Sequence, residues 1–235
     1  MKLLAIETAT ESCSAALLVN DEVICLSEIA PRRHNEIILP MCEQVLAQGQ
    51  TSLSQLDAIA FGRGPGAFTG VRLAASVTQG IALGQDLPVV PVSSLASLAQ
   101  AAFETQHTTQ VLPCIDARMQ EIYYGLYALN KNEMDIYNFM ELVGEEKVTS
   151  ANLVEADVDD DCYGVGSGWG AYAENLQETL GKKISFNSEV FPQAEYVAKL
   201  AKVYFKQGKS VAAVEALPVY LRDNVADKPK NKMVF

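Results

Sequence analysis

The spacing of apolar residues changes along the chain, and each change predicts a new structural element. The chain opens on short apolar runs separated by polar turns, which is the pattern of a β-meander. Apolar residues then recur three and four positions apart, as on one face of a helix, at Ile37, Ile38, Met41, Val45 and Leu46. We therefore predict three antiparallel strands followed by a helix, with Asn35 as its N-cap.

The rest of the first half continues as strand–helix units, and the second half repeats the order of a meander followed by strands and helices. The expected strands cover residues 2–7, 13–19, 22–29, 58–61, 87–92, 111–116, 122–129, 135–142 and 162–165. The expected helices cover residues 36–48, 68–83, 94–103, 152–156, 169–180 and 193–206. A hairpin turn is expected at Asn130–Asn132, and Ser93 or Ser94 is expected to cap the third helix.

Two halves with the same order of elements predict an α/β protein of two related domains, each a mixed sheet flanked by helices. The actin-like ATPases, Hsp70 and the sugar kinases share this plan, which is called the ASKHA fold. The polar stretch Thr105–Gln110 has no apolar period and marks the boundary. We predict an N-terminal domain over residues 1–107, a C-terminal domain over 108–215, and a tail over 216–235 that returns to the domain interface.

Composition and charge narrow the classes of protein. The apolar runs are too short to cross a bilayer, and Glu7 interrupts the apolar start before any cleavage site, so we expect a cytoplasmic protein. The five cysteines are widely spaced without a Cys-x-x-Cys pair, which favours reduced thiols over disulfides or a zinc site. The net charge of −11 disfavours direct binding of nucleic acid, and the basic cluster Lys228–Lys232 is expected to be a solvated tail.

The loop Gly62–Gly70 holds four glycines and a proline between a predicted strand and a predicted helix. It nearly fits the Gly-x-Gly-x-x-Ala pattern of dinucleotide-binding folds, but no acidic residue ends the next strand about twenty residues later. It is not a Walker loop, since no Gly-Lys-Ser/Thr sequence follows. The alternative is a structural strand-to-helix turn with Arg63 and Arg72 exposed.

Two further segments have the composition of a nucleotide site. The hairpin Glu7–Ser14 offers hydroxyls and backbone N–H groups that can hold a phosphate. The segment Gly164–Gly170 alternates glycines between a strand and a helix, which suits an adenosine or phosphate cradle. For both, the alternative is a loop that satisfies its own backbone, so we expect at most weak binding of ATP or ADP. The candidate nucleotide-binding residues are Thr8, Thr10, Gly164, Gly166 and Gly168.

The sequence offers no metal-binding pattern and no catalytic residue. The acidic run Glu155–Asp161 lacks the ligand order of an EF-hand, so we expect a solvated loop. The two histidines, His34 and His107, do not form a pair at metal-ligand spacing. Neither lies in a recognisable Ser/His/Asp or Cys/His context.

Five segments carry a family resemblance when they are read in order along the chain. They are Leu4–Thr10, Arg33–Pro40, Gly62–Arg72, Ile115–Met119 and Pro218–Arg222. Together they resemble the TsaB (YeaZ) family of bacterial tRNA threonylcarbamoyladenosine (t6A) biosynthesis proteins, over nearly the whole chain. The loop is the most specific segment, whereas position 7 is Glu where the family often has Asp.

The resemblance implies an ASKHA fold without catalysis of its own. The related catalytic subunit, TsaD, carries a His-x-x-x-His metal motif where this chain reads Ser93–Leu98 without a histidine, so no metal site is expected. The resemblance further implies pairing with TsaD through the N-terminal domains, a complex completed by the P-loop ATPase TsaE, and contact with tRNA only through that complex. The complex transfers a threonylcarbamoyl group to the adenosine 3′ of the anticodon, in tRNAs that read codons beginning with A.

The predicted helix Glu36–Gln48 carries an apolar arc wider than one buried stripe needs. We therefore expect a partner-binding face there, which would also form a homodimer when the chain is alone; the alternative is a wide core face. The expected interface residues are Leu39, Met41, Cys42, Leu46, Val71 and Ala75.

Two other functions stay open at this point. An active actin-fold ATPase or small-molecule kinase is suggested by the hairpin Glu7–Ser14 and the segment Gly164–Gly170. A protease acting on TsaD is a role once attached to this family, although the sequence gives it no motif.

Overall fold

A computed structural model describes residues 1–130 and 138–222 of the chain. Its first half is built on a five-stranded mixed sheet in which β1 pairs antiparallel with β2 and parallel with β4. The meander therefore continues directly into parallel strand–helix units, as the pattern predicts. The strands, in their spatial order, are β3 (Glu22–Ile29), β2 (Ser12–Val19), β1 (Lys2–Glu7), β4 (Ala58–Gly62) and β5 (Val89–Val92).

The second half repeats this arrangement in another five-stranded mixed sheet. Here β6 pairs antiparallel with β7 and parallel with β9. The strands, in their spatial order, are β10 (Ser185–Asn187), β9 (Tyr163–Val165), β6 (Gln110–Arg118), β7 (Glu121–Leu129) and β8 (Met140–Ser150). The two mixed sheets, each covered by helices, confirm the predicted α/β class.

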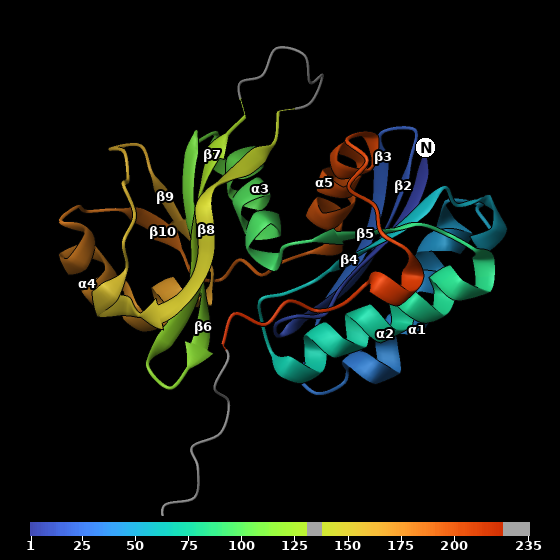
Figure 1. Ribbon diagram of the computed structural model, residues 1–235, viewed down its shortest axis with the longest axis horizontal. Coiled ribbons are helices and arrows are strands. Elements are labelled where there is room, and N and C mark those ends of the chain that lie inside the picture. Colours follow the sequence, from blue (N-terminus) through green and yellow to red (C-terminus); the bar gives the residue numbers. More distant parts are fainter. Residues whose placement is uncertain (131–137, 223–235) are drawn as a thin grey trace, which may run out of the picture.

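The helices alternate with the sheets in layers (Figure 1). Helices α1 and α2 cover the outer face of the first sheet, α3 and α5 lie between the two sheets, and α4 covers the outer face of the second. The α-helices are α1 (His34–Gln48), α2 (Phe68–Gln85), α3 (Ser94–Gln106), α4 (Ser167–Leu180) and α5 (Ala194–Lys206). Three short 3₁₀ helices are η1 (Leu53–Gln55), η2 (Ala151–Leu153) and η3 (Ala213–Glu215).

One hydrophobic cluster joins the two halves. It contains Leu3 and Leu18 from the first sheet, Tyr127 and Val165 from the second, and residues of α3 and α5 between them. Burial of this shared apolar surface stabilises the relative position of the sheets by the same effect that stabilises each sheet alone. The halves therefore pack as one body around a common core.

Several boundaries differ from the sequence prediction. Helix α1 begins at His34 with Arg33 as its N-cap, two residues ahead of the expected Asn35 cap. The helix expected over 152–156 is the 3₁₀ turn Ala151–Leu153. Strand β10 was not predicted, because its three residues are all exposed and show no apolar alternation. Ser93 caps α3 as expected, accepting hydrogen bonds from the N–H groups of Leu95 and Ala96.

Other predictions fall on undescribed residues or on a different element. The turn Asn130–Asn132, the start of the strand expected over 135–142, and the cluster Lys228–Lys232 lie outside the described residues. Helix α5, placed by sequence in the 108–215 domain, packs on the first sheet instead. None of the helices among residues 1–130 and 138–222 has the length and hydropathy needed to cross a membrane.

Candidate functional site

A cleft of about 1070 Å³ opens between the two halves. One wall is formed by the β1–β2 hairpin at Thr8–Glu11 and by the start of α2. The opposite wall is the β6–β7 hairpin at Ile115–Arg118, and the segment Val219–Arg222 lies along its edge. All five segments that carry the family resemblance therefore meet around one cavity, since His34 and Asn35 also line it.

The loop Gly62–Gly70 uses its backbone to bind its own chain. The N–H of Arg63 donates to Val92 O at 2.8 Å, and the N–H of Ala67 donates to Ala9 O at 2.7 Å. The carbonyl of Arg63 accepts from Val219 N at 2.9 Å. These bonds tie the loop to β5, to the first hairpin and to the C-terminal segment, which is the arrangement of a structural turn.

Glu7, at the end of β1, is fully buried and enclosed by its own chain. Its Oε1 accepts from the N–H of Ala9 at 2.7 Å, and its Oε2 accepts from the hydroxyl of Ser94 at 2.8 Å. Burial raises the pKa of this carboxyl, although the hydrogen bonds oppose the shift. Gly62 lies against the same group, so that a Cβ there would be 1.9 Å from Oε2. The carboxyl therefore does not face the cleft.

The first pair of candidate nucleotide residues lines the cleft, but only one hydroxyl is available. The Oγ1 of Thr8 donates to the carbonyl of Gly70 at 2.8 Å, so it satisfies the backbone of the loop. The Oγ1 of Thr10 has no hydrogen-bond partner within residues 1–130 and 138–222. Of these two threonines, Thr10 is thus the one whose hydroxyl is left unpaired.

The three candidate glycines are buried and packed against their own chain. A Cβ on Gly164 would meet the Trp169 ring at 2.4 Å, and one on Gly168 would meet Cys114 at 2.8 Å. Gly166 has φ +100° and would bring a Cβ within 2.6 Å of Cys114 O. Close packing of α4 on β6 therefore explains these glycines, and they do not form an open cradle with Thr8 and Thr10.

A buried polar network joins the loop to the second sheet. Arg63 donates to Oε2 of Glu146, on β8, at 3.0 Å. Oε1 of the same carboxylate accepts from Tyr127 at 2.6 Å and from the hydroxyl of Ser93. Burial and the neighbouring carboxylate raise the pKa of Tyr127 well above its usual value, so the phenol stays a donor. Contrary to the sequence prediction, Arg63 is paired and largely covered.

The rim of the cleft carries two half-exposed aromatic rings beside an arginine. The guanidinium of Arg72 lies 3.5 Å from the centroid of the Phe68 ring and donates from Nε to Tyr220 at 2.7 Å. The ring centroids of Phe68 and Tyr220 are 5.7 Å apart. Next to them, Arg222 donates to the carbonyl of Ala117 at 3.1 Å, which fixes the C-terminal segment to the β6–β7 hairpin.

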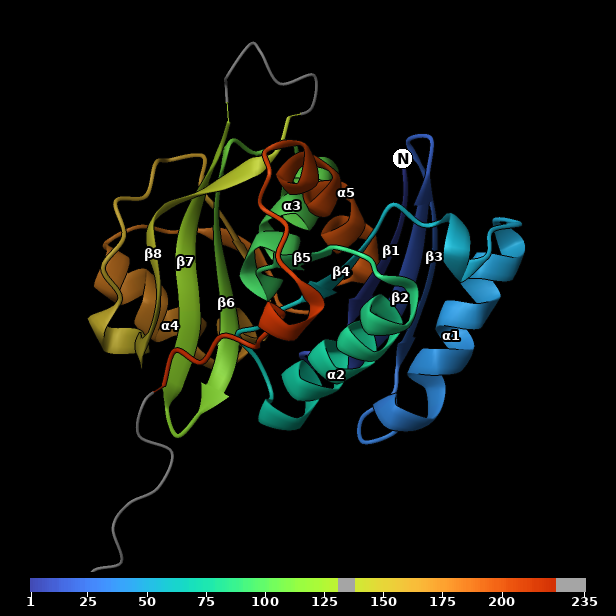
Figure 2. The ribbon, with the colours of Figure 1, turned by 45° about the vertical axis from the view of Figure 1, so that its right-hand side comes forward.

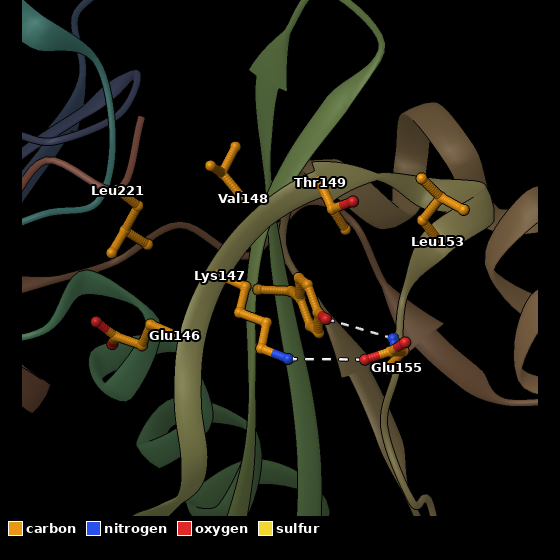
Figure 3. A pocket seen from close by; sticks show the side chains of 8 residues that line it. Glu146, Lys147, Val148, Thr149, Leu153, Glu155 and Leu221 are labelled. Atoms are coloured by element: carbon orange, nitrogen blue, oxygen red, sulfur yellow. Dashed lines mark hydrogen bonds and ion pairs between the residues drawn. The ribbon is translucent and has the colours of Figure 1, made fainter. Parts of the chain in front are cut away.

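A smaller hollow of about 400 Å³ lies on β8, and Glu146 of the polar network is part of its lining (Figure 3). Lys147 pairs with Glu155 at 3.8 Å across it, and Tyr124 accepts from the N–H of Glu155 at 3.3 Å. The side chain of Glu146 points away from this ion pair. The lining includes neither histidine nor cysteine, so it has no Cys/His or Ser/His arrangement.

The described residues show no metal-binding cluster, and burial makes several of their cysteines poor nucleophiles. No group of three His, Cys, Asp or Glu side chains in residues 1–130 and 138–222 is placed to hold a metal ion. Burial raises the pKa of the thiols of Cys13, Cys42 and Cys162 to about 12. These cysteines are neutral thiols near pH 7, which makes them weak nucleophiles.

The predicted partner-binding residues divide into one exposed and five buried side chains. Leu39 is 50% exposed on α1. The other five are buried: Met41, Cys42, Leu46 and Ala75 pack in the core between the first sheet and its outer helices, and Val71 is covered where it lines the cleft. Because this chain's own residues cover them, the apolar arc of α1 is mostly core face, and only Leu39 of the six lies at the surface.

Sequence reasoning missed the contacts at the rim of the cleft and the contact between Arg63 and Glu146. Phe68, Arg72 and Tyr220 lie inside segments that carry the family resemblance, so those segments held the signal. Glu146 had no such signal, since it stands in a polar stretch of β8 that resembles an exposed strand. Only the three-dimensional pairing with Arg63 identifies it.

Comparison with known proteins agrees with this geometry. A family profile described as tRNA N6-adenosine threonylcarbamoyltransferase (TsaD) matches residues 26–230. The tRNA threonylcarbamoyladenosine biosynthesis proteins TsaB of Haemophilus influenzae and Escherichia coli are each 40% identical to the chain, and the alignments cover 97% of it and 96% and 97% of the relatives.

The solved structure of YeaZ from Pseudomonas aeruginosa superposes with a TM-score of 0.86 at 42% identity, covering 94% of this chain and 99% of that one. The duplicated mixed sheets and the match to a TsaD-type family confirm the predicted ASKHA architecture. The chain therefore belongs to the TsaB (YeaZ) family.

Proposed function

We propose that this chain is a non-catalytic subunit required for t6A formation, and that it binds and activates a TsaD-type catalytic subunit together with a TsaE-type ATPase. The reaction modifies the adenosine 3′ of the anticodon in tRNAs that read codons beginning with A. Support comes from relatives of almost the same length whose names place them in t6A biosynthesis. In this proposal the chain works in the cytoplasm, where tRNA is modified.

One observation carries the non-catalytic part of the proposal: the groups at the start of α3 are already used to hold the fold together. By resemblance, the catalytic relative has its metal-binding histidines in this region. Here Ser93 caps α3 and hydrogen-bonds to Glu146, while Ser94 hydrogen-bonds to the buried Glu7. Two hydroxyls engaged in this way are poor metal ligands, and the nearest carboxylate is closed to substrate.

The outer face of α1 and α2 is the surface that we propose for partner binding. The two helices lie side by side over the first sheet (Figure 2). Leu39 on α1 and Leu83 on α2 are 50% and 62% exposed. Gly80 lies within α2, and apart from the adjoining backbone of the helix no atom of the described residues lies within 4 Å of the position that a Cβ would take there. A partner helix can therefore approach closely at this point. The same surface would pair two copies when the chain is alone.

The test is a charge placed on this face. Leu39→Asp and Leu83→Asp are expected to weaken association with a TsaD-type subunit, measured by analytical ultracentrifugation, because each buries an unpaired carboxylate in the contact. Leu153→Asp is the matched control, since Leu153 is 69% exposed but lies on η2 of the second half. Association that is equally strong in all three variants would contradict the proposed surface.

Leu46→Asp does not test this surface, because Leu46 is buried in the core of the first half and a charge there would unfold the protein.

Weak binding of ATP or ADP remains a separate prediction. The unpaired hydroxyl of Thr10 supports it, whereas the closely packed Gly164, Gly166 and Gly168 do not.

A further inference from the structure

We propose that the cleft between the two halves binds a single-stranded stretch of the RNA substrate directly. The inference rests on the proposed function, because that function brings tRNA to the chain. It also goes beyond it, since the net charge of −11 disfavours direct binding of nucleic acid and the family resemblance implies contact with tRNA only through the complex. The reasons are the local charge of the cleft, the aromatic rings at its rim and two polar atoms in its lining that have no hydrogen-bond partner.

The cleft is locally positive on an acidic protein. Its lining holds four arginines against two carboxylates, and these charged residues are Arg32, Arg72, Arg118, Arg222, Glu11 and Asp116. Arg118 is paired with Asp116 at 2.9 Å, and Arg222 is paired with Glu121. In the described part of the chain neither Arg32 nor Arg72 pairs with a carboxylate. The excess of arginine in the lining therefore favours an anionic ligand in the cleft.

The aromatic rim distinguishes nucleic acid from other anions. Phe68 and Tyr220 are 50% and 46% exposed and stand beside the Arg72 guanidinium. Unstacked bases of single-stranded RNA bind to aromatic rings and arginine planes, and the bases of a duplex are not available for this. An acidic peptide would use the arginines but would gain nothing specific from two half-exposed rings.

Two polar atoms in the same cleft lack a partner. Oγ1 of Thr10 and Nε2 of His34 are buried without a hydrogen bond inside the described ranges, and both residues line the cleft. Buried polar groups are normally satisfied, so these atoms indicate a missing ligand or solvent. The cavity of about 1070 Å³ lies at the upper end of the range of about 300–1,000 Å³ that is typical of small-molecule pockets.

The test is fluorescence anisotropy of the full chain with a labelled single-stranded RNA of about ten nucleotides at low salt. Phe68→Ala and Arg32→Glu are expected to weaken binding about tenfold, because one removes a stacking ring and the other reverses a cleft charge. Arg33→Glu is the matched control. It makes the same charge change one residue away, on a side chain that is 57% exposed and outside the cleft, and should change binding less than about twofold.

Three results would overturn the proposal. The first is no binding of wild type up to about 1 mM RNA. The second is equal binding by the Phe68, Arg32 and Arg33 variants. The third is displacement of the RNA by a polyglutamate peptide as effectively as by unlabelled RNA, which would show that the cleft recognises charge alone.

A reconstituted t6A reaction separates this inference from the proposed function. If the reaction requires the chain but Phe68→Ala leaves the KM for tRNA unchanged, the RNA site is wrong and the activator function stands. If the reaction proceeds fully without the chain, the proposed function fails whatever the anisotropy shows. A raised KM for tRNA with Phe68→Ala, absent with Arg33→Glu, supports the inference.

Discussion

The guanidinium of Arg63 lies 3.0 Å from Oε2 of Glu146, and this pair joins the glycine-rich loop of the first half to β8 of the second. The same carboxylate accepts from Tyr127 and from Ser93, the residue that caps α3. The backbone carbonyl of Arg63 binds the C-terminal segment through Val219. One residue of the loop therefore connects three parts of the chain that are distant in sequence.

Arg63→Ala is expected to lower the free energy of unfolding by about 2–3 kcal/mol, because it leaves the buried Glu146 carboxylate without its charged donor. Urea unfolding monitored by circular dichroism measures this change. Arg33→Ala is the control, since its ion pairs are exposed and should contribute less than about 1 kcal/mol. Equal stability of the two variants would show that the interdomain pair is unimportant.

Two glycine substitutions of the same size are expected to act in opposite directions. Gly62→Ala would place a methyl group 1.9 Å from Glu7 Oε2 and should destabilise the fold by about 1–3 kcal/mol. Gly80→Ala adds a methyl group in open space inside the helix α2, and should stabilise by about 0.5–1 kcal/mol. Thermal unfolding of both variants checks the pair, and a Gly62→Ala protein as stable as wild type would contradict the packing.

The stability of the protein should depend on pH through Glu7. Burial raises the pKa of this carboxyl above its ordinary value of 4.5, so the folded state keeps the proton to a higher pH than the unfolded state does. The contribution of Glu7 to the free energy of unfolding is therefore fully present below about pH 4.5 and is lost as the pH rises through the folded-state pKa.

Glu7→Gln, which stays neutral, should not show this loss. Its stability relative to wild type should rise between about pH 4.5 and the folded-state pKa and then stay level. Urea midpoints of both proteins across this range measure the difference. A difference that does not change with pH would mean that Glu7 is not held in the buried state described.

Much of the fold could be predicted from the sequence, because apolar spacing reports directly on which face of an element is buried. The meanders, the helix α2 after the loop and the Ser93 cap of α3 follow from local patterns. The packing of α5 on the first sheet could not be predicted. The apolar face of an amphipathic helix indicates that the helix packs on something, but it does not indicate on which sheet.

The site was harder to predict than the fold. The apolar arc on α1 looked like a docking surface, but a long run of apolar residues cannot show how much of it the chain itself covers. The alternating glycines after β9 looked like a cradle, but close approach of α4 to β6 requires glycine equally well. The contact between Arg63 and Glu146 depends on how two domains meet, which no local pattern reports.

The central claim is that the chain is required for t6A formation without catalysing it. The most direct measurement is t6A formed on purified tRNA by the reconstituted TsaD- and TsaE-type subunits, with and without this chain. We predict product only when the chain is present, and loss of product with Leu39→Asp but not with Leu153→Asp. Full t6A formation in the absence of the chain would contradict the account.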